Sequence, residues 1–143
     1  MRRFVSLALV PLALGLAACD PRAADSAGPP QPPADAPEIP AEFRADIRLV
    51  GTEPFWALRI AADRMVLSRI GQPDLTVTHA GPSGRADEAE WAGEGLTARV
   101  VRQVCSDGMS DRVYPYAATL EAGGQTLKGC GDAESAFPAP KAD

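Results

Sequence analysis

Apolar and polar residues alternate with a period of two through most of the chain from residue 43 to residue 132. Ile47 and Leu49 alternate with charged residues, and Trp56 and Ile60 fall on one face of the run that follows. Successive side chains of a β-strand point to opposite faces of a sheet, so this period predicts strands with one buried face. No segment shows sustained helical spacing.

Turn-forming residues divide this region into about eight short runs. Glycine, proline and aspartate gather between the runs, and Gly123-Gly124 separates the last two as the turn of a β-hairpin. Turn signals spaced about 8–12 residues apart are typical of an antiparallel sandwich or barrel. We therefore predict an all-β fold, a small antiparallel barrel or sandwich. The expected strands span 44–49, 55–60, 64–69, 75–79, 88–91, 96–104, 116–121 and 125–130.

A continuous apolar segment lies at the N-terminus, where Phe4 to Ala18 follows Met1-Arg2-Arg3. This layout is typical of a secretory signal, and the run is too short and wrongly flanked for a spanning helix. Leu16-Ala17-Ala18-Cys19 resembles the bacterial lipobox, in which the signal is cut before a cysteine that then carries lipid. We predict a signal peptide at 1–18, a lipid anchor at Cys19 and a periplasm-facing location in the bacterial cell envelope. The choice of inner or outer membrane stays open, and the alternative is a soluble exported protein.

Residues 19–42 are predicted to form a linker. Seven prolines fall between Pro21 and Pro40. Such a composition buries too little apolar surface to offset the entropy of ordering, and it favours extended polyproline II. The β domain is then expected at 43–132, and a flexible tail is expected at 133–143.

The net charge argues against one class of partner. The chain carries −5 at pH 7, and removal of the signal peptide deletes Arg2 and Arg3 without an acidic residue, which leaves −7. An acidic protein without a basic cluster is a poor ligand for nucleic acid or for anionic lipid. We expect attachment to the membrane through the lipid anchor and no nucleic-acid partner, and the oligomeric state stays open.

Two cysteines remain once Cys19 is assigned to lipid. Cys105 and Cys130 form an even pair in an oxidising compartment, which predicts a disulfide that closes the ends of the hairpin region. The alternative is two free, buried thiols. We predict no metal site and no cofactor, because there is no C-x-x-C pair and the only histidine, His79, is distant in sequence.

Two stretches contain candidate binding residues. In the first, Glu53 is a candidate ligand-facing carboxylate, with Phe55 or Trp56 as a contact. The structural alternative, which we favour, places Trp56 in the core and Glu53 in a turn where it accepts backbone hydrogen bonds.

The second stretch is the loop that follows Cys105. Asp107, Ser110 and Asp111 offer oxygen ligands for calcium, although the EF-hand spacing and its final glutamate are missing. Local capping of backbone N–H groups is the favoured alternative, and partner binding by the loop stays open. Tyr114 belongs either to the core of the hairpin or to the same contact surface.

The two stretches together resemble a family of small bacterial envelope proteins, usually lipoproteins. The residues that carry the resemblance are Gly51-Thr52-Glu53-Pro54-Phe55-Trp56, Cys105-Ser106-Asp107-Gly108-Met109-Ser110-Asp111-Arg112-Val113-Tyr114-Pro115 and Gly129-Cys130. Members of that family occur fused to META-type and lysozyme inhibitor-like domains. The resemblance covers residues 47–130 and implies a Cys105–Cys130 disulfide, and it implies no particular activity.

These observations favour a membrane-anchored module that binds an envelope protein or glycan without catalysis. One alternative is an assembly accessory of a membrane complex. The other is a hydrolase, for which Ser110, His79 and Asp111 supply the residue types of a triad. No G-x-S-x-G elbow surrounds Ser110, so we predict no catalytic residues.

Overall fold

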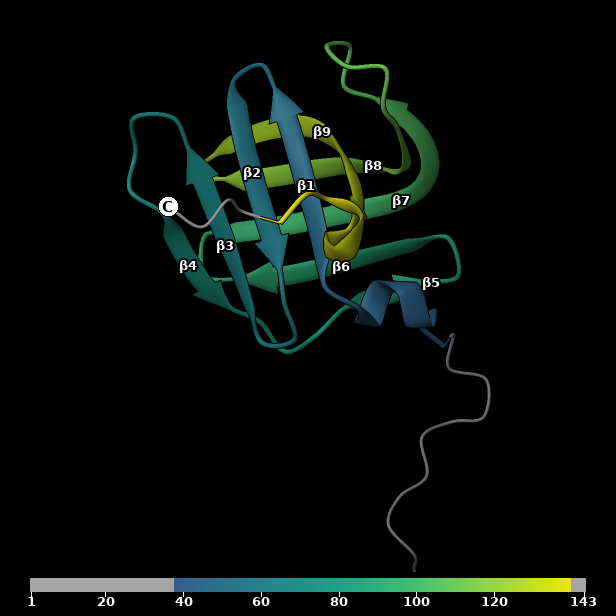
Figure 1. Ribbon diagram of the computed structural model, residues 1–143. Coiled ribbons are helices and arrows are strands. Elements are labelled where there is room, and N and C mark those ends of the chain that lie inside the picture. Colours follow the sequence, from purple (N-terminus) through teal and green to yellow (C-terminus); the bar gives the residue numbers. More distant parts are fainter. Residues whose placement is uncertain (1–37, 140–143) are drawn as a thin grey trace, which may run out of the picture. The chain divides into compact units, whose positions relative to one another are not determined.

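The computed structural model describes residues 38–139, which form nine strands and two short turns of 3-10 helix (Figure 1). This confirms the predicted all-β class. The signal peptide, Cys19 and most of the linker lie outside the described residues. No helix within 38–139 is long and apolar enough to cross a membrane. The elements are η1 (Ala41–Arg44), β1 (Ile47–Thr52), β2 (Phe55–Ile60), β3 (Arg64–Arg69), β4 (Leu75–Thr78), β5 (Ser83–Arg85), β6 (Glu88–Gly93), β7 (Leu96–Ser106), β8 (Val113–Ala122), β9 (Gln125–Ala133) and η2 (Glu134–Ala136).

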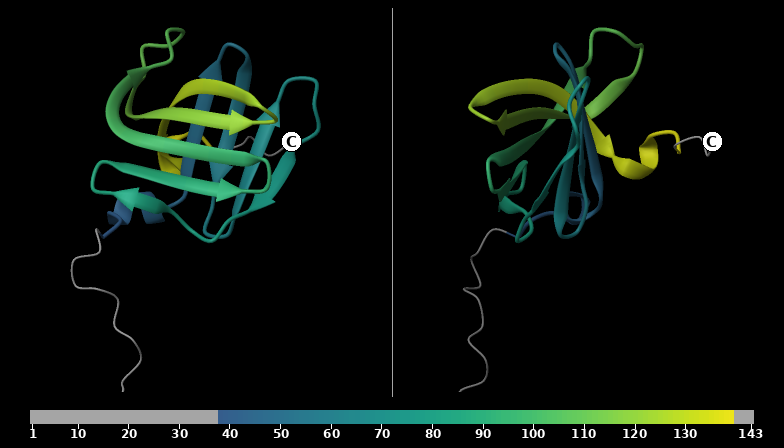
Figure 2. Two further views of the ribbon diagram at one scale, coloured as in Figure 1. Left: turned by 180° about the vertical axis from the view of Figure 1, so that it is seen from behind. Right: turned by 90° about the vertical axis from the view of Figure 1, so that its left-hand side faces the viewer.

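The strand order makes the sheet a curled half-barrel. The order is β4-β3-β2-β1-β9-β8-β7-β6-β5, and every pair is antiparallel. The last strand returns to the first, so that Ile47 lies opposite Ala133 and Val50 lies opposite Cys130. The sheet curls so that β1–β3 cross over β6–β8 (Figures 1 and 2). β4 and β5 are the two edge strands, and no strand among residues 38–139 pairs with the outer side of either.

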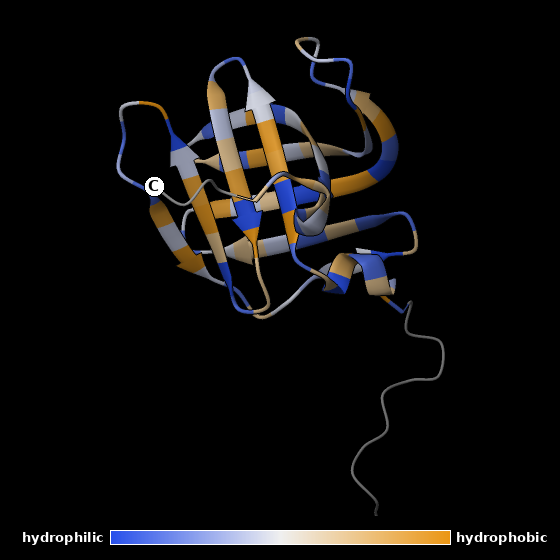
Figure 3. Cartoon of the chain, in the orientation of Figure 1, coloured by the Kyte–Doolittle hydropathy of each residue, from blue (hydrophilic) through white to orange (hydrophobic). Residues whose placement is uncertain are grey.

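The core fills the space between the two halves of the curled sheet. Hydrophobic and hydrophilic positions alternate along the strands (Figure 3), and the inward positions of β1 and β2 are those predicted from the period of two. Trp91 of β6 packs edge-on against Phe43, with ring centroids 6.4 Å apart. The large buried side chains include Phe43, Ile47, Leu49, Trp56, Leu58, Ile60, Met65, Leu67, Trp91, Leu96, Val100 and Leu120.

Pairing across strands moves several predicted boundaries. β2 and β3 have the predicted limits, but β1 continues through Gly51 and Thr52 because these residues pair with Trp56 and Phe55 of β2. The segment between the strands expected at 75–79 and 88–91 contains β5, which pairs with β6. Local composition is typical of a turn in both places. Pairing with the neighbouring strand holds these residues in extended conformation instead.

The beginning of the domain differs from the prediction. A strand was expected from residue 44, but Ala41–Arg44 forms a turn of 3-10 helix in which the Phe43 N–H donates to the Pro40 carbonyl at 3.0 Å. Phe43 is thereby turned into the core, where its ring lies 5.5 Å from that of Tyr116. Ala45 is in phase with Ile47 and Leu49, but it lies outside the strand and is exposed.

The end of the domain also differs from the prediction. A tail was expected from residue 133, but β9 includes Ala133 and η2 follows. The Glu134 N–H donates to the Asp46 carbonyl at 2.9 Å, and the Glu134 carboxylate lies 3.0 Å from the Arg59 guanidinium. These contacts attach η2 to the sheet.

Candidate functional site

One end of the sheet brings the two candidate stretches together. The turn between β1 and β2 and the loop between β7 and β8 both lie at the top of Figure 1. The Thr52 hydroxyl donates to the Asp107 carbonyl at 3.4 Å, although the two residues are far apart in sequence. The curl of β7 and β8 therefore completes a surface that neither stretch forms alone.

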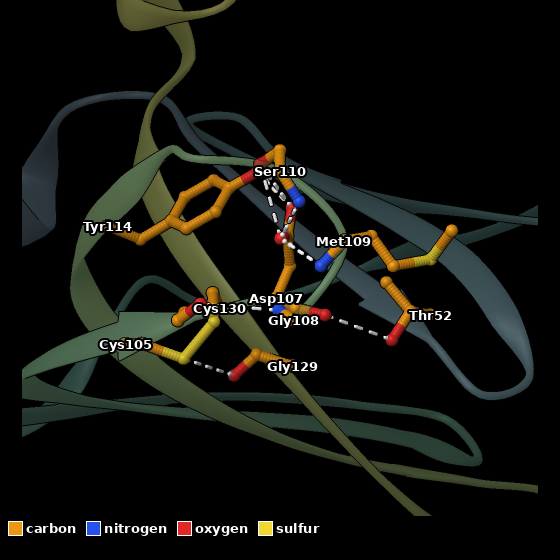
Figure 4. Close-up of a disulfide and its surroundings, with 10 residues drawn as sticks. Thr52, Cys105, Asp107, Gly108, Met109, Ser110, Tyr114, Gly129 and Cys130 are labelled. Carbon is orange, nitrogen blue, oxygen red and sulfur yellow. Dashed lines mark hydrogen bonds between the residues drawn. A yellow bond between two sulfur atoms is a disulfide. The ribbon is translucent and has the colours of Figure 1, made fainter.

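The loop is built around the carboxylate of Asp107 (Figure 4). This carboxylate accepts hydrogen bonds from the Met109 N–H at 3.0 Å, from the Ser110 N–H at 2.9 Å and from the Tyr114 hydroxyl at 3.0 Å. The bonds from the Met109 and Ser110 N–H groups, with smaller contributions from the two hydroxyls, lower the pKa of Asp107 to about 2. Asp107 is therefore an ionised structural acceptor at neutral pH.

Ser110 is also committed to the loop. Its hydroxyl lies 2.9 Å from an Asp107 carboxylate oxygen and accepts a hydrogen bond from the Arg112 N–H at 3.3 Å. This is local capping, the alternative favoured over calcium binding. Among residues 38–139, no group of three or more His, Cys, Asp or Glu side chains is placed to hold a metal ion.

The disulfide lies at the root of this loop. Cys105 and Cys130 are bonded, with their Cα atoms 5.6 Å apart, so the predicted pairing is confirmed. We expected the bond to close the ends of one hairpin. It instead joins β7, which contains Cys105, to β9, which contains Cys130, and these strands are the two neighbours of β8. The register of β7 against β8 shifts between Arg102 and Cys105, immediately before the disulfide. The disulfide thus fixes the base of the loop to β9.

Tyr114 is buried in a small cluster outside the main core. Its ring centroid lies 6.2 Å from that of Phe137, and the Arg112 guanidinium lies over both rings. The same guanidinium lies 3.0 Å from the Asp132 carboxylate. Burial, followed by the hydrogen bond to Asp107, raises the pKa of Tyr114. Tyr114 therefore supports the loop, and its burial leaves little of the ring exposed.

Trp56 is part of the core, as the structural alternative predicted. Only 4% of its surface is exposed. Its indole lies against Gly51 of β1 and Gly129 of β9, where a Cβ at Gly129 would lie 2.8 Å from the Trp56 ring. The two motif glycines and the motif tryptophan therefore form one packing unit. The indole N–H has no hydrogen-bond partner among the described residues.

Phe55 and Glu53 are both exposed at this end of the sheet. Phe55 is 50% exposed and borders a groove of about 410 Å³. The Glu53 side chain makes no hydrogen bond within the described part of the chain, so the expected turn contact is not observed. We call the groove the apolar rim; it is lined by Phe55, Trp56, Ala57, Ser68, Arg69 and Ile70.

Sequence reasoning missed Ile70, which is 80% exposed at the edge of the apolar rim. A signal was available, because the inward positions of β3 are Met65 and Leu67 and an even-numbered residue falls on the outer face. An apolar residue out of phase with its strand and next to a turn is a candidate contact residue.

The residues of the hypothetical triad are not assembled. The main-chain N–H of His79 bonds to Asp63 in the turn between β2 and β3, at the end of the sheet opposite the loop that contains Ser110 (Figure 1). Both ring nitrogens of His79 are used there, with Nε2 2.9 Å from the Ala61 carbonyl and Nδ1 accepting from the Gly81 N–H at 3.0 Å. Asp111 is exposed and makes no hydrogen bond within residues 38–139.

Comparison with protein-family profiles, curated proteins and solved structures found no match for this chain. The fold and the site are those of a disulfide-bonded antiparallel half-barrel with an exposed apolar rim and a hydrogen-bonded loop at one end.

Proposed function

We propose that this protein is a lipid-anchored binding module of the bacterial cell envelope that holds a protein partner at its apolar rim and performs no chemistry. The observation that carries the proposal is the exposure of Phe55 and Ile70 beside one groove. The lipobox-like Leu16-Ala17-Ala18-Cys19 supports the anchor.

The energetic argument rests on apolar surface left in water. Burying a side chain such as phenylalanine or isoleucine contributes about 1.5–3 kcal/mol. Two such side chains beside one shallow groove offer a partner an apolar anchor. The exposed carboxylate of Glu53 lies in the adjoining turn and Arg69 lines the groove, so the fitting partner offers an apolar side chain flanked by charged or polar groups that complement both.

The direction of the chain supports this arrangement. The described residues enter the sheet through η1, and β1 then runs to the opposite end, where the turn at Glu53 and Pro54 leads to the rim (Figure 1). A tether attached through the N-terminal side therefore joins the domain at the end remote from the rim.

A binding experiment tests the rim. The oxidised protein is immobilised and incubated with solubilised envelope from its native host, and the retained protein is identified by mass spectrometry. We expect a partner that is lost in a Phe55→Ser/Ile70→Ser variant and kept in Val104→Ser, since Val104 is 75% exposed but lies on β7 and does not line the groove. Equal retention by wild type and both variants would reject the rim as the binding face.

A labelling experiment tests the anchor. Cells that express the full chain are fed an alkyne-tagged fatty acid, and the purified protein is assayed for the tag. We expect labelling of the wild type and none of Cys19→Ala, with the protein shifted from the membrane fraction to the soluble fraction. Labelling that survives the substitution would disprove the anchor at Cys19.

A further inference from the structure

The edge strand β4 offers backbone hydrogen-bonding groups to a further strand. β4 pairs with β3 on one side, where Met65 lies opposite Val77 and Val66 opposite Thr76. On its other side no strand among residues 38–139 pairs with it. An unpaired edge presents a row of N–H and C=O groups that match another extended chain.

β4 lacks two of the features that protect an edge, charged side chains and proline. Its four residues, Leu75–Thr78, contain no charge and no proline, and Leu75, Thr76 and Thr78 are exposed. The other edge, β5, is three residues long and contains Gly84 and the charged Arg85. Charged side chains and short strands discourage pairing at an edge. The two edges therefore differ, and β4 is the one open to pairing.

A groove of about 430 Å³ follows this edge, lined by Leu75–Thr78 and by Glu94. Glu94 lies in the turn between β6 and β7 and lines the groove together with β4. Beside it, Gly93 lies so close to β4 that a Cβ there would be 2.6 Å from the Thr78 carbonyl oxygen. Gly93 therefore packs against the end of β4 at Thr78, so the open part of the edge is short. A short open edge suits a single extended segment better than the edge of a whole second sheet.

The charges around the groove are negative, and they favour a basic partner segment. Glu94 lines it, and Asp74 immediately precedes β4 at the other end. No lysine or arginine lines the groove. The complementary segment is therefore extended, free of proline on its bonding edge, and basic.

We propose that β4 binds an extended basic segment of a partner protein, which adds to the sheet as a further strand and places a lysine or arginine against Glu94. Recognition of this kind draws affinity from the main chain and specificity from alternate side chains. The site uses none of the residues of the apolar rim, so it stands independently of the function proposed above.

The test uses the ¹⁵N-labelled full-length protein with its disulfide formed and a capped octapeptide of alternating lysine and valine. Binding is followed by NMR, and we expect the largest shifts, together with slowed amide exchange, at Leu75–Thr78. Two further peptides carry N-methyl groups on all valines or on all lysines. Since an added strand bonds through every second residue, one isomer should bind at least about fivefold more weakly than the other.

Matched variants test the charge. Glu94→Gln should weaken binding of the unmethylated lysine–valine peptide about two- to fivefold, as expected for an exposed ion pair. Glu90→Gln, a substitution in β6, should leave the affinity unchanged. Equal binding of the two methylated isomers would show adhesion by charge alone and would overturn the proposal. Shifts that map to the apolar rim, or no shifts at millimolar peptide, would overturn it as well, and neither result bears on the rim experiment.

Discussion

The indole of Trp56 occupies the position that a side chain on Gly51 would take. The two residues lie opposite each other on β1 and β2 at the end of the sheet that holds the candidate site. A Cβ added to Gly51 would collide with the indole nitrogen and its neighbouring carbons. Packing therefore requires glycine at this position. The requirement does not come from the backbone, because Gly51 is not among the glycines with a positive φ angle.

Gly51→Ala should destabilise the protein by about 1–3 kcal/mol, the usual cost of overpacking a core. Urea denaturation gives the free energy of unfolding. In a Trp56→Phe background the same substitution should cost less, because the smaller ring leaves room for the added methyl group. An equal cost in both backgrounds would show that the indole is not the obstacle.

Loss of the disulfide should lower stability substantially. The bond joins residues 25 positions apart, and removal of a cross-link of that span costs about 3.5 kcal/mol through the entropy of the unfolded chain. The double variant Cys105→Ser/Cys130→Ser should therefore melt at a lower temperature and be cut faster by protease. A melting curve equal to that of the oxidised wild type would refute the stabilising role.

The loop should lose stability in acid. The folded protein holds the pKa of Asp107 at about 2 against an ordinary 3.8, so ionised Asp107 favours the folded loop. This contribution is complete above the higher value and is lost as the pH falls through the lower one. The amide resonances of Met109 and Ser110 should titrate with a midpoint near 2, and Asp107→Asn should abolish that titration. A midpoint close to 3.8 would contradict the hydrogen bonds described.

Phe137 should attach the C-terminal segment to the domain. Its ring centroid lies 4.2 Å from the Arg112 guanidinium and 5.1 Å from that of Arg48. Phe137→Leu keeps an apolar side chain and loses the two cation–π contacts, so it should destabilise the protein by about 1 kcal/mol. Phe55→Leu is the matched control and should change the free energy of unfolding by less than about 0.5 kcal/mol, as for other exposed positions. Equal effects would argue against the attachment.

Much of the fold was predictable because one face of nearly every strand is buried. The period of two placed Ile47 and Leu49 on one face of the first strand, and Trp56 and Ile60 on one face of the second. Both faces are buried, as predicted. Turn chemistry was equally informative at Gly123 and Gly124, whose positive φ angles of 57° and 78° suit a two-residue hairpin turn. Burial and turn geometry are local consequences of the residue types.

The candidate site was predictable only in part. The sequence singled out Glu53, Phe55 and the loop around Asp107, and the structure places them at one end of the sheet. It could not separate contact residues from supporting ones, because that depends on what packs above each side chain. Phe55 is exposed, whereas Tyr114 is covered through its contacts with Phe137 and Arg112.

By itself, the sequence determined the all-β class, the buried face of the strands and the pairing of Cys105 with Cys130. These follow from the period of side chains along a strand and from the chemistry of an even pair of thiols. Only the tertiary structure decided that the disulfide joins β7 to β9, that Ile70 joins Phe55 in one groove, and that no strand among residues 38–139 pairs with the outer side of β4. Each of these features depends on the order of strands in the sheet. That order brings distant segments into contact, and the local pattern of residues does not specify it.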